Sequence, residues 1–269
     1  MTTTHLTEKK FSDFSLNESL LKGLNEAGFE FCTPIQAETL PHARAGRDVA
    51  GQAQTGTGKT MAFLLAAYQH LLSQEPDEQR KINQPRVLIL APTRELAIQI
   101  EKDASIIGKH TGLKLGLVYG GTGYDSQRKM LEKGVDILVG TPGRLIDYFK
   151  QGLYKLDKLD VLILDEADRM FDMGFIKDVE KIINYVPKKR QTLLFSATIY
   201  SDVHRIMIRH LHNPLIVKTR SQVDTTKLKQ VYYEINQQNR KFSLLVHLLR
   251  NSTPGLAIVF CSTRRESDI

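Results

Sequence analysis

The sequence predicts an α/β protein in which a mostly parallel central sheet lies between two layers of helices. Short apolar runs recur along the chain, and they are apolar at nearly every position rather than at alternate ones. Such runs are typical of parallel strands that are covered on both faces. Segments with apolar residues at helical spacing separate them, and this alternation indicates βαβ units. Ligands of such sheets bind beyond the carboxyl ends of the strands, so the residues there decide the function.

The strands and helices are expected in a regular alternation. The predicted strands are the runs near 47–52, 86–92, 114–121, 136–141, 161–166, 192–198 and 215–219. Long helical patterns cover 60–74 and 93–110, and the polar segment at 73–85 is typical of a surface loop. A second polar stretch at 218–227 is typical of a linker. Beyond it, the runs at 228–235, 239–251 and 256–262 predict the start of another strand–helix–strand unit, too short to fold independently.

Composition excludes some classes of protein and leaves others open. No apolar run approaches the ~20 residues that a membrane helix needs, so no membrane role is expected. The only cysteines, Cys32 and Cys261, show no paired spacing, which favours a reducing, cytoplasmic setting over a disulfide framework or a structural zinc. A net charge of +7 favours a polyanionic partner weakly. Basic tracts interleaved with aromatic residues are missing, so a nucleic acid would be held by its backbone.

The strongest motif follows the first strand and opens a helix. It matches the phosphate-loop pattern G-x-x-x-x-G-K-[ST] except at its first position, where Ala replaces Gly. Its glycines allow backbone conformations in which consecutive N–H groups point at a phosphate. Lys59 would contact the β- and γ-phosphates, and the Thr60 hydroxyl would ligate Mg²⁺. A plain glycine-rich turn is the alternative. The residues expected to bind nucleotide here are Ala53, Gln54, Thr55, Gly56, Thr57, Gly58, Lys59 and Thr60.

Acidic residues follow the apolar run at 161–164. In phosphate-loop enzymes, a carboxylate at the end of a second strand holds Mg²⁺ on the phosphates, and Asp165 is placed to do so. Glu166 is then placed to polarise a water for in-line attack on the γ-phosphate. A dication would make the carboxylate cluster stable. The alternative is an acidic helix start that the helix dipole favours, and the phosphate loop argues against it.

The residues Asp165–Asp168 spell Asp-Glu-Ala-Asp, and the chain resembles the DEAD-box ATP-dependent RNA helicases. Other motifs occur in that family's order: 28–36 resembles the adenine-recognising Q motif, 92–96, 120–121 and 141–144 resemble RNA-contacting motifs, and 196–198 resembles the motif that couples hydrolysis to strand separation. The resemblance covers the chain from about Phe11. It implies a RecA-like fold, ATP and Mg²⁺ as cofactors, and RNA as the partner.

The resemblance also implies roles for individual side chains. Gln36 offers the donor and acceptor that an adenine edge needs. Phe11 would stack on the base, and the alternative for it is a core anchor for the N-terminal segment. The hydroxyls of Ser196 and Thr198 would bond Asp168 and link it to the RNA side. The alternative for them is simple capping of a helix that starts near residue 201.

The expected RNA contacts lie after three different strands. Thr93 can cap the following helix while the exposed N–H groups take an RNA phosphate, and the run at 141–144 repeats this logic. Each motif alone is more typical of a cap or a turn, but three on one rim favour a track for the RNA backbone. The 2′-hydroxyl would select RNA over DNA. The residues concerned are Pro92, Thr93, Arg94, Gly120, Gly121, Thr141, Pro142, Gly143 and Arg144.

The resemblance divides the chain into an ATP-binding domain at 1–217, a linker at 218–227, and a truncated beginning of the C-terminal helicase domain at 228–269. It implies an RNA-stimulated ATPase that unwinds RNA locally in RNA turnover, with a degradosome ribonuclease as a partner. The arginine finger of the second domain is absent, so we expect this chain to bind Mg-ATP but to be defective in unwinding. Two alternatives stay open: a nucleotide-gated RNA-binding or scaffold fragment, and a DNA-acting phosphate-loop motor.

Overall fold

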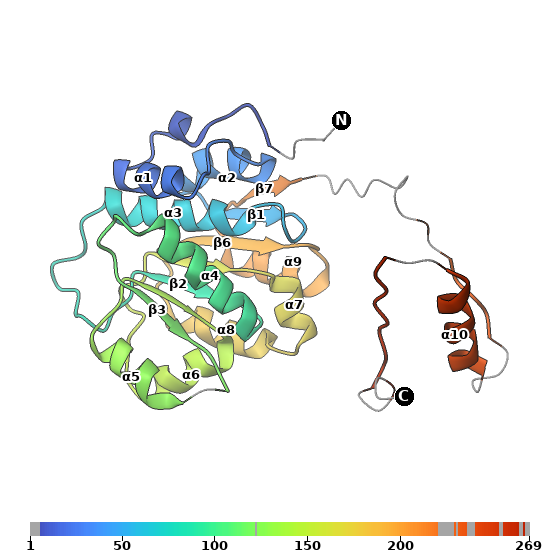
Figure 1. The fold of residues 1–269 in the computed structure, drawn as a ribbon. Helices are drawn as coiled ribbons and strands as arrows, with labels where there is room; N and C mark the ends of the chain where they lie inside the picture. Colours follow the sequence, from blue (N-terminus) through green and yellow to red (C-terminus); the bar gives the residue numbers. More distant parts are fainter. Residues whose placement is uncertain are drawn as a thin grey trace. The chain divides into compact units, whose positions relative to one another are not determined.

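The computed structural model describes residues 6–121, 123–219, 229, 231–235, 240–252, 255–263 and 266. The chain forms two compact units, Met1–Ser221 and Gln222–Ile269, and each is described by itself. The first unit is a sheet with helices on both faces, as Figure 1 shows. No helix in the described residues is both long and apolar enough to cross a membrane.

The seven predicted strands of the first unit are confirmed, and they pair in one sheet. Each registered pair of neighbouring strands is parallel. The order across the sheet is β3-β4-β2-β5-β6-β1-β7. The strands are β1 (Val49–Gln52), β2 (Val87–Leu90), β3 (Leu115–Val118), β4 (Ile137–Gly140), β5 (Val161–Leu164), β6 (Gln191–Ser196) and β7 (Leu215–Lys218).

Both faces of the sheet are buried, which explains why the central strands are apolar throughout. In β5, Val161 and Ile163 pack into one hydrophobic cluster, and Leu162 and Leu164 pack into the other. Helices α1 to α4 contribute to the first cluster and α5 to α9 to the second. The helices of this unit are η1 (Phe11–Phe14), α1 (Glu18–Glu26), α2 (Pro34–Arg44), α3 (Lys59–Ser73), α4 (Arg94–Ile107), α5 (Tyr124–Glu132), α6 (Pro142–Lys150), α7 (Ala167–Asp172), α8 (Ile176–Tyr185) and α9 (Ser201–His210).

The strand order separates the motifs into two groups along the carboxyl ends of the strands. The motifs expected to bind nucleotide, to hydrolyse it and to couple hydrolysis to strand separation follow β1, β5 and β6, which are consecutive neighbours in the sheet. The motifs expected to bind RNA follow β2, β3 and β4, which are consecutive neighbours on the other side. The two groups meet where β2 pairs with β5. We call these the nucleotide half and the RNA half of the carboxyl rim.

The second unit corrects one prediction. The helix expected at 239–251 forms as α10 (Lys241–Asn251), but the described residues 231–235 and 255–263 are not in strands. A strand needs a neighbour to bond its backbone N–H and C=O groups, and apolar patterning does not supply one. None of the α10 side chains is buried. The expected linker at 218–227 lies mostly outside the described residues, and the domain boundaries stay a prediction.

Candidate active site

The phosphate-loop residues connect β1 to α3 in a conformation that requires glycine. Gly56 and Gly58 have φ values of +82° and +89°, in the left-handed region. Gly58 is also crowded, because a Cβ there would lie 2.4 Å from Nε2 of Gln36. Ala53 is not among the described residues with positive φ, so alanine is tolerated where the motif usually has glycine. Its N–H donates to the Ser196 carbonyl oxygen at 3.0 Å, which fixes the loop to β6.

Lys59 is the first residue of α3, and its side chain is 5% exposed. Its Nζ has no hydrogen-bond partner among the residues that the structure describes. A buried ammonium group without a partner is unfavourable, so this position fits an anionic ligand that would bond it. The exposed residues Gln54, Thr55 and Gly56 leave the loop open on the outer side. These observations fit a phosphate group against the loop.

Asp165 follows β5 and is almost fully buried. Burial raises the pKa of its carboxyl to about 7; the Lys59 charge opposes this shift, and the Glu166 and Asp168 charges add to it. No group of three or more His, Cys, Asp or Glu side chains in the described residues could hold a metal by itself. Mg²⁺ commonly takes only one or two protein oxygens and completes its shell with phosphates and waters. Asp165 and Thr60 fit that mode of binding and not a cage made of protein alone.

Glu166 is held in a specific place by its backbone and by two neighbours. It caps α7 with φ +48° and ψ +51°, and its N–H donates to Oδ1 of Asp165 at 2.9 Å. Arg169 donates from Nη1 to Glu166 Oε2 at 3.1 Å, and Thr55 donates from its hydroxyl to Oε1 at 3.4 Å. Sequence reasoning missed the contact with Arg169. The spacing of three residues within a helix start was the available signal.

Asp168 connects β5 to β6 through side-chain hydrogen bonds. Thr198 donates to Asp168 Oδ2 from both its N–H and its hydroxyl, each at 2.9 Å. The backbone N–H of Asp168 donates to the Ser196 hydroxyl at 3.2 Å. Partial burial acts to raise the pKa of Asp168, but the hydrogen bonds from Ser196 and Thr198 outweigh it and leave the pKa below its ordinary value. A charged Asp168 is therefore fixed between the two strand ends.

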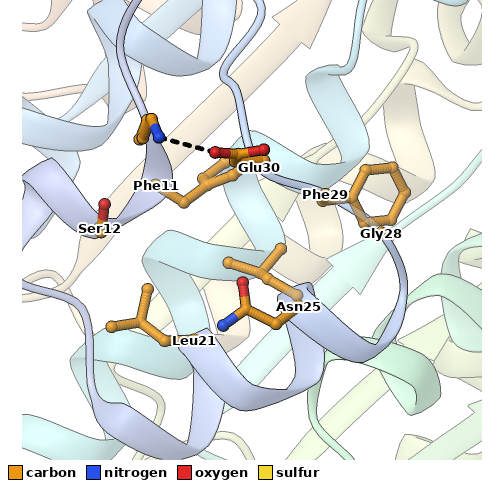
Figure 2. Close-up of a pocket in the computed structure, with 9 residues that line it drawn as sticks. Phe11, Ser12, Leu21, Asn25, Gly28, Phe29 and Glu30 are labelled. Atoms are coloured by element: carbon orange, nitrogen blue, oxygen red, sulfur yellow. Dashed lines mark hydrogen bonds and ion pairs between the residues drawn. The ribbon is translucent and has the colours of Figure 1, made fainter.

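Gln36 and Phe11, both expected at the adenine, occupy different surroundings. Gln36 accepts from the Thr33 N–H at 2.8 Å and donates from Nε2 to the Gly58 carbonyl oxygen at 3.0 Å, so it braces the phosphate loop. Phe11 is 2% exposed in the core and lines a cavity of about 440 Å³ between α1 and the segment at 28–30. Figure 2 shows Phe11, Asn25 and Phe29 around this pocket. Gln36 does not line it, and the adenine contacts stay predictions.

The RNA half of the rim carries the remaining expected contacts. Thr93 accepts from the Leu96 N–H at 3.3 Å, as a helix cap does. Arg94 is exposed, and its guanidinium lies 5.3 Å from the ring centre of Tyr119. Pro142 opens α6 after Thr141, and no side-chain hydrogen bond caps that helix. Gly120, Gly121 and Gly143, the glycines expected to contact RNA, are exposed.

Arg144 differs from Arg94, because only 8% of it is exposed. Its guanidinium lies 3.9 Å from the ring centre of Tyr124, and its Nη1 donates to the Tyr148 hydroxyl at 3.2 Å. The guanidinium therefore faces tyrosines of this chain, and its contact with RNA stays a prediction. Sequence reasoning missed both tyrosines. Tyr124 belongs to a different helix, whereas Tyr148 lies four residues after Arg144 in α6, and that spacing was the available signal.

Comparisons with known proteins show the family of this chain. The family model described as "DEAD/DEAH box helicase" matches residues 33–206. The chain belongs to the DEAD/DEAH box helicase family. A solved DEAD box protein from the hyperthermophile Methanococcus jannaschii superposes with a TM-score of 0.72 and 35% identity, covering 90% of this chain and 63% of that one. This match confirms the RecA-like fold that the resemblance implied.

Two curated relatives of the DEAD-box chain are bacterial. The proteins called "ATP-dependent RNA helicase RhlB" of Shewanella piezotolerans and Shewanella woodyi are each 50% identical to it over 272 aligned positions. The alignments cover 100% of this chain and 62% and 61% of those proteins. The chain thus spans less than two thirds of the length of these DEAD-box relatives.

Proposed function

We propose that the chain is the nucleotide-binding part of an ATP-dependent RNA helicase and hydrolyses ATP at the nucleotide half of the rim. The observation that carries this proposal is the buried Nζ of Lys59, which has no hydrogen-bond partner in the described part of the chain and whose charge acts on the buried carboxyl of Asp165. A bound triphosphate would accept a hydrogen bond from the Lys59 ammonium group, and the cation bound to the triphosphate would neutralise the Asp165 carboxylate. Membership of the DEAD/DEAH box family and the names of the relatives, which are ATP-dependent RNA helicases, support it.

Each residue of the nucleotide half has a chemical task in this proposal. Lys59 and the loop N–H groups bind the β- and γ-phosphates. Thr60 and Asp165 would hold Mg²⁺, which supplies charge neutralisation to the phosphates when bound. Glu166 accepts the proton of the attacking water, and Arg169 and Thr55 orient its carboxylate. Asp168 transmits changes at the nucleotide from the end of β5 to the end of β6 through its hydrogen bond with Thr198.

RNA would bind at the other half of the rim, along its backbone. The N-termini of α4 and α6 present N–H groups at the ends of β2 and β4, which are neighbouring strands. The glycines after β3 let an RNA phosphate approach the main chain. We further propose a cytoplasmic setting, which the free cysteines Cys32 and Cys261 support. A degradosome ribonuclease as a partner rests on the resemblance alone.

ATP turnover by the purified 269-residue chain, with and without RNA, tests the proposal. Glu166→Gln should remove turnover while ATP still binds, and Lys59→Ala should weaken ATP binding itself. Glu38→Gln, an exposed carboxylate on α2, is the matched control and should behave as the unmodified chain. Equal ATP affinity of the Lys59→Ala variant and the unmodified chain would refute the nucleotide site.

The finer part of the proposal concerns what this chain does alone. We expect weak Mg-ATP binding, slow hydrolysis and no strand separation, because the DEAD-box relatives are longer and a second domain supplies an arginine finger worth roughly 10³–10⁵ in rate. A fluorescent RNA duplex is the probe, and ATP-dependent strand release would contradict this part. Competition between RNA and DNA of the same sequence tests the alternative of a DNA-acting motor. Preferential binding of RNA argues against that alternative, and preferential binding of DNA supports it.

A further inference from the structure

Two arginine–tyrosine pairs lie at the RNA half of the rim. Arg94, at the start of α4, faces the ring of Tyr119 after β3, with 5.3 Å between guanidinium and ring centre. Arg144, near the start of α6, faces the ring of Tyr124 at the start of α5, at 3.9 Å. Tyr119 directly follows β3, and Tyr124 is the first residue of α5, the next element along the chain. Arginines at the starts of α4 and α6 therefore pair with two tyrosines that are five positions apart in the sequence.

The ring of Tyr124 has two contacts and its main chain a third, and the residue is still half exposed. The Arg144 guanidinium lies against it, and Tyr148 meets it at 5.8 Å with an interplanar angle of 87°. The Tyr148 hydroxyl also donates to the Tyr124 carbonyl oxygen at 3.1 Å, which ties the main chain to α6. In spite of these contacts, 51% of Tyr124 is exposed. An aromatic ring held in place at the surface loses little entropy when a ligand stacks on it.

The occupant that fits this ring is a nucleobase. The exposed Arg94, the open N-termini of α4 and α6 and the exposed glycines around Tyr124 suit a polyanionic backbone. A strand whose phosphates follow these groups would carry its bases next to the ring. Every base has a π-face, so stacking on a tyrosine adds affinity without selecting a sequence. The guanidinium of Arg144 on the ring adds a cation–π contact that holds the tyrosine in place.

We propose that Tyr124 is an RNA-binding residue that stacks on one base of a single-stranded RNA. Arg144 and Tyr148 act as positioning residues that hold its ring, and Arg144 then acts through Tyr124. This inference rests on the proposed function, since it deepens how the same rim binds RNA. It also revises the expectation that the chain grips the backbone alone.

A tryptophan placed at residue 124 reports stacking directly, because the chain contains no tryptophan. Titration of Tyr124→Trp with a short single-stranded RNA, in the presence of a non-hydrolysable ATP analogue and Mg²⁺, should quench its emission saturably. Tyr185→Trp is the matched control, because Tyr185 ends α8 before β6 starts, at the opposite edge of the sheet. Its emission should not change. Equal responses from the two positions would overturn the proposal.

Affinity measurements on other variants separate stacking from a structural role. With fluorescein-labelled RNA, Tyr124→Phe should bind within about twofold of the unmodified chain, and Tyr124→Ala on the order of tenfold more weakly, as for the loss of one stacked base. The salt dependence of Tyr124→Ala should match that of the unmodified chain. The slope of log affinity against log salt concentration could instead fall by the amount expected for about one phosphate contact. That result would mean that Tyr124 only positions Arg144 for a phosphate, and it would overturn the proposal.

RNA binding by the chain and base stacking by Tyr124 can be tested separately. An unmodified chain that does not bind the labelled RNA overturns the RNA part of the proposed function, and this inference with it. An unmodified chain that binds RNA, beside a Tyr124→Ala variant of equal affinity and an unquenched Tyr124→Trp, overturns the inference alone.

Discussion

Glu166 combines the proposed catalytic carboxylate with an unfavourable backbone conformation. Its φ of +48° lies in the left-handed region, which costs a residue with a Cβ about 1–2 kcal/mol. Hydrogen bonds on both sides maintain it, since its N–H bonds Asp165 and its carboxylate bonds Arg169. Such strain is typical of functional sites, where surrounding contacts hold a residue in place. Here the left-handed turn lets two consecutive acidic residues follow β5 and still begin α7.

Glycine at position 166 should therefore give a more stable protein than alanine does, which reverses the usual order of these two residues within a helix. Both variants lose the carboxylate, but only alanine keeps the strained Cβ, so Glu166→Gly should be about 1 kcal/mol more stable than Glu166→Ala. Neither should turn over ATP. At Lys181, an exposed position within α8, alanine should instead be more stable by about 1 kcal/mol. Urea unfolding of the four variants measures both differences, and the same order at both sites would contradict the strain.

At the scale of elements, Asp48 connects the start of β1 to its two neighbours in the sheet. Its carboxyl is 4% exposed. Oδ1 accepts from the Thr192 N–H of β6 at 2.7 Å, and Oδ2 accepts from the His212 N–H ahead of β7 at 2.6 Å. Both carboxylate oxygens thus accept hydrogen bonds that join β1 to β6 and β7. In the sequence, long crossover segments separate these three parallel strands.

Asp48→Asn should destabilise the fold although it keeps the shape of the side chain. The amide nitrogen would face one of the two backbone donors, which leaves a buried N–H without an acceptor and costs about 1–3 kcal/mol. Asp202→Asn, at an exposed position on α9, should change the free energy of unfolding by less than about 0.5 kcal/mol. Urea midpoints at constant m-value measure the comparison. Equal midpoints for the two variants would show that the carboxylate does not join the strands.

The sequence predicted elements better than it predicted their contacts. The strands of the first unit were predictable because burial on both faces leaves continuous apolar runs such as Val161–Leu164. The same reasoning failed at 231–235 and 255–263, since a pattern does not provide a strand's neighbour. The phosphate loop was predictable because its spacing is local. The contacts of Arg144 with Tyr124, and of Asp48 with Thr192, join distant segments, and nothing in the sequence pairs them.

At the scale of the whole first unit, the order of the strands in the sheet determines which motifs lie together. The chain visits β1, β2, β3, β4, β5 and β6 in turn, yet the sheet places β2, β3 and β4 together and β1, β5 and β6 together. In the sequence, the three RNA motifs separate the phosphate loop after β1 from the motifs after β5 and β6, and the sheet brings those three together as the nucleotide half. The halves meet at the β2–β5 pair, where the Asp165 N–H donates to the Leu90 carbonyl oxygen at 3.0 Å.

The effect of RNA on ATP turnover should depend on the hydrogen bonds around Asp168, which join the ends of β5 and β6 within the nucleotide half. Thr198→Val keeps the backbone donor to Asp168 and removes the hydroxyl donor at 2.9 Å. ATP affinity should be unchanged, because the phosphate loop is untouched, whereas the increase in turnover caused by RNA should fall several-fold. Thr111→Val, which removes a hydroxyl bonded to the Gly108 carbonyl oxygen after α4, is the matched control and should keep the full increase.

Turnover at saturating ATP, measured across an RNA titration, distinguishes two ways in which Thr198→Val could act. A lower plateau at an unchanged half-saturating RNA concentration means that RNA still binds and that its effect no longer reaches the carboxylates. A higher half-saturating concentration with the same plateau would mean that Thr198 belongs to the RNA contact surface instead. The geometry favours the first outcome, because the hydroxyl is bonded to a carboxylate three residues beyond Asp165, on the nucleotide half of the rim.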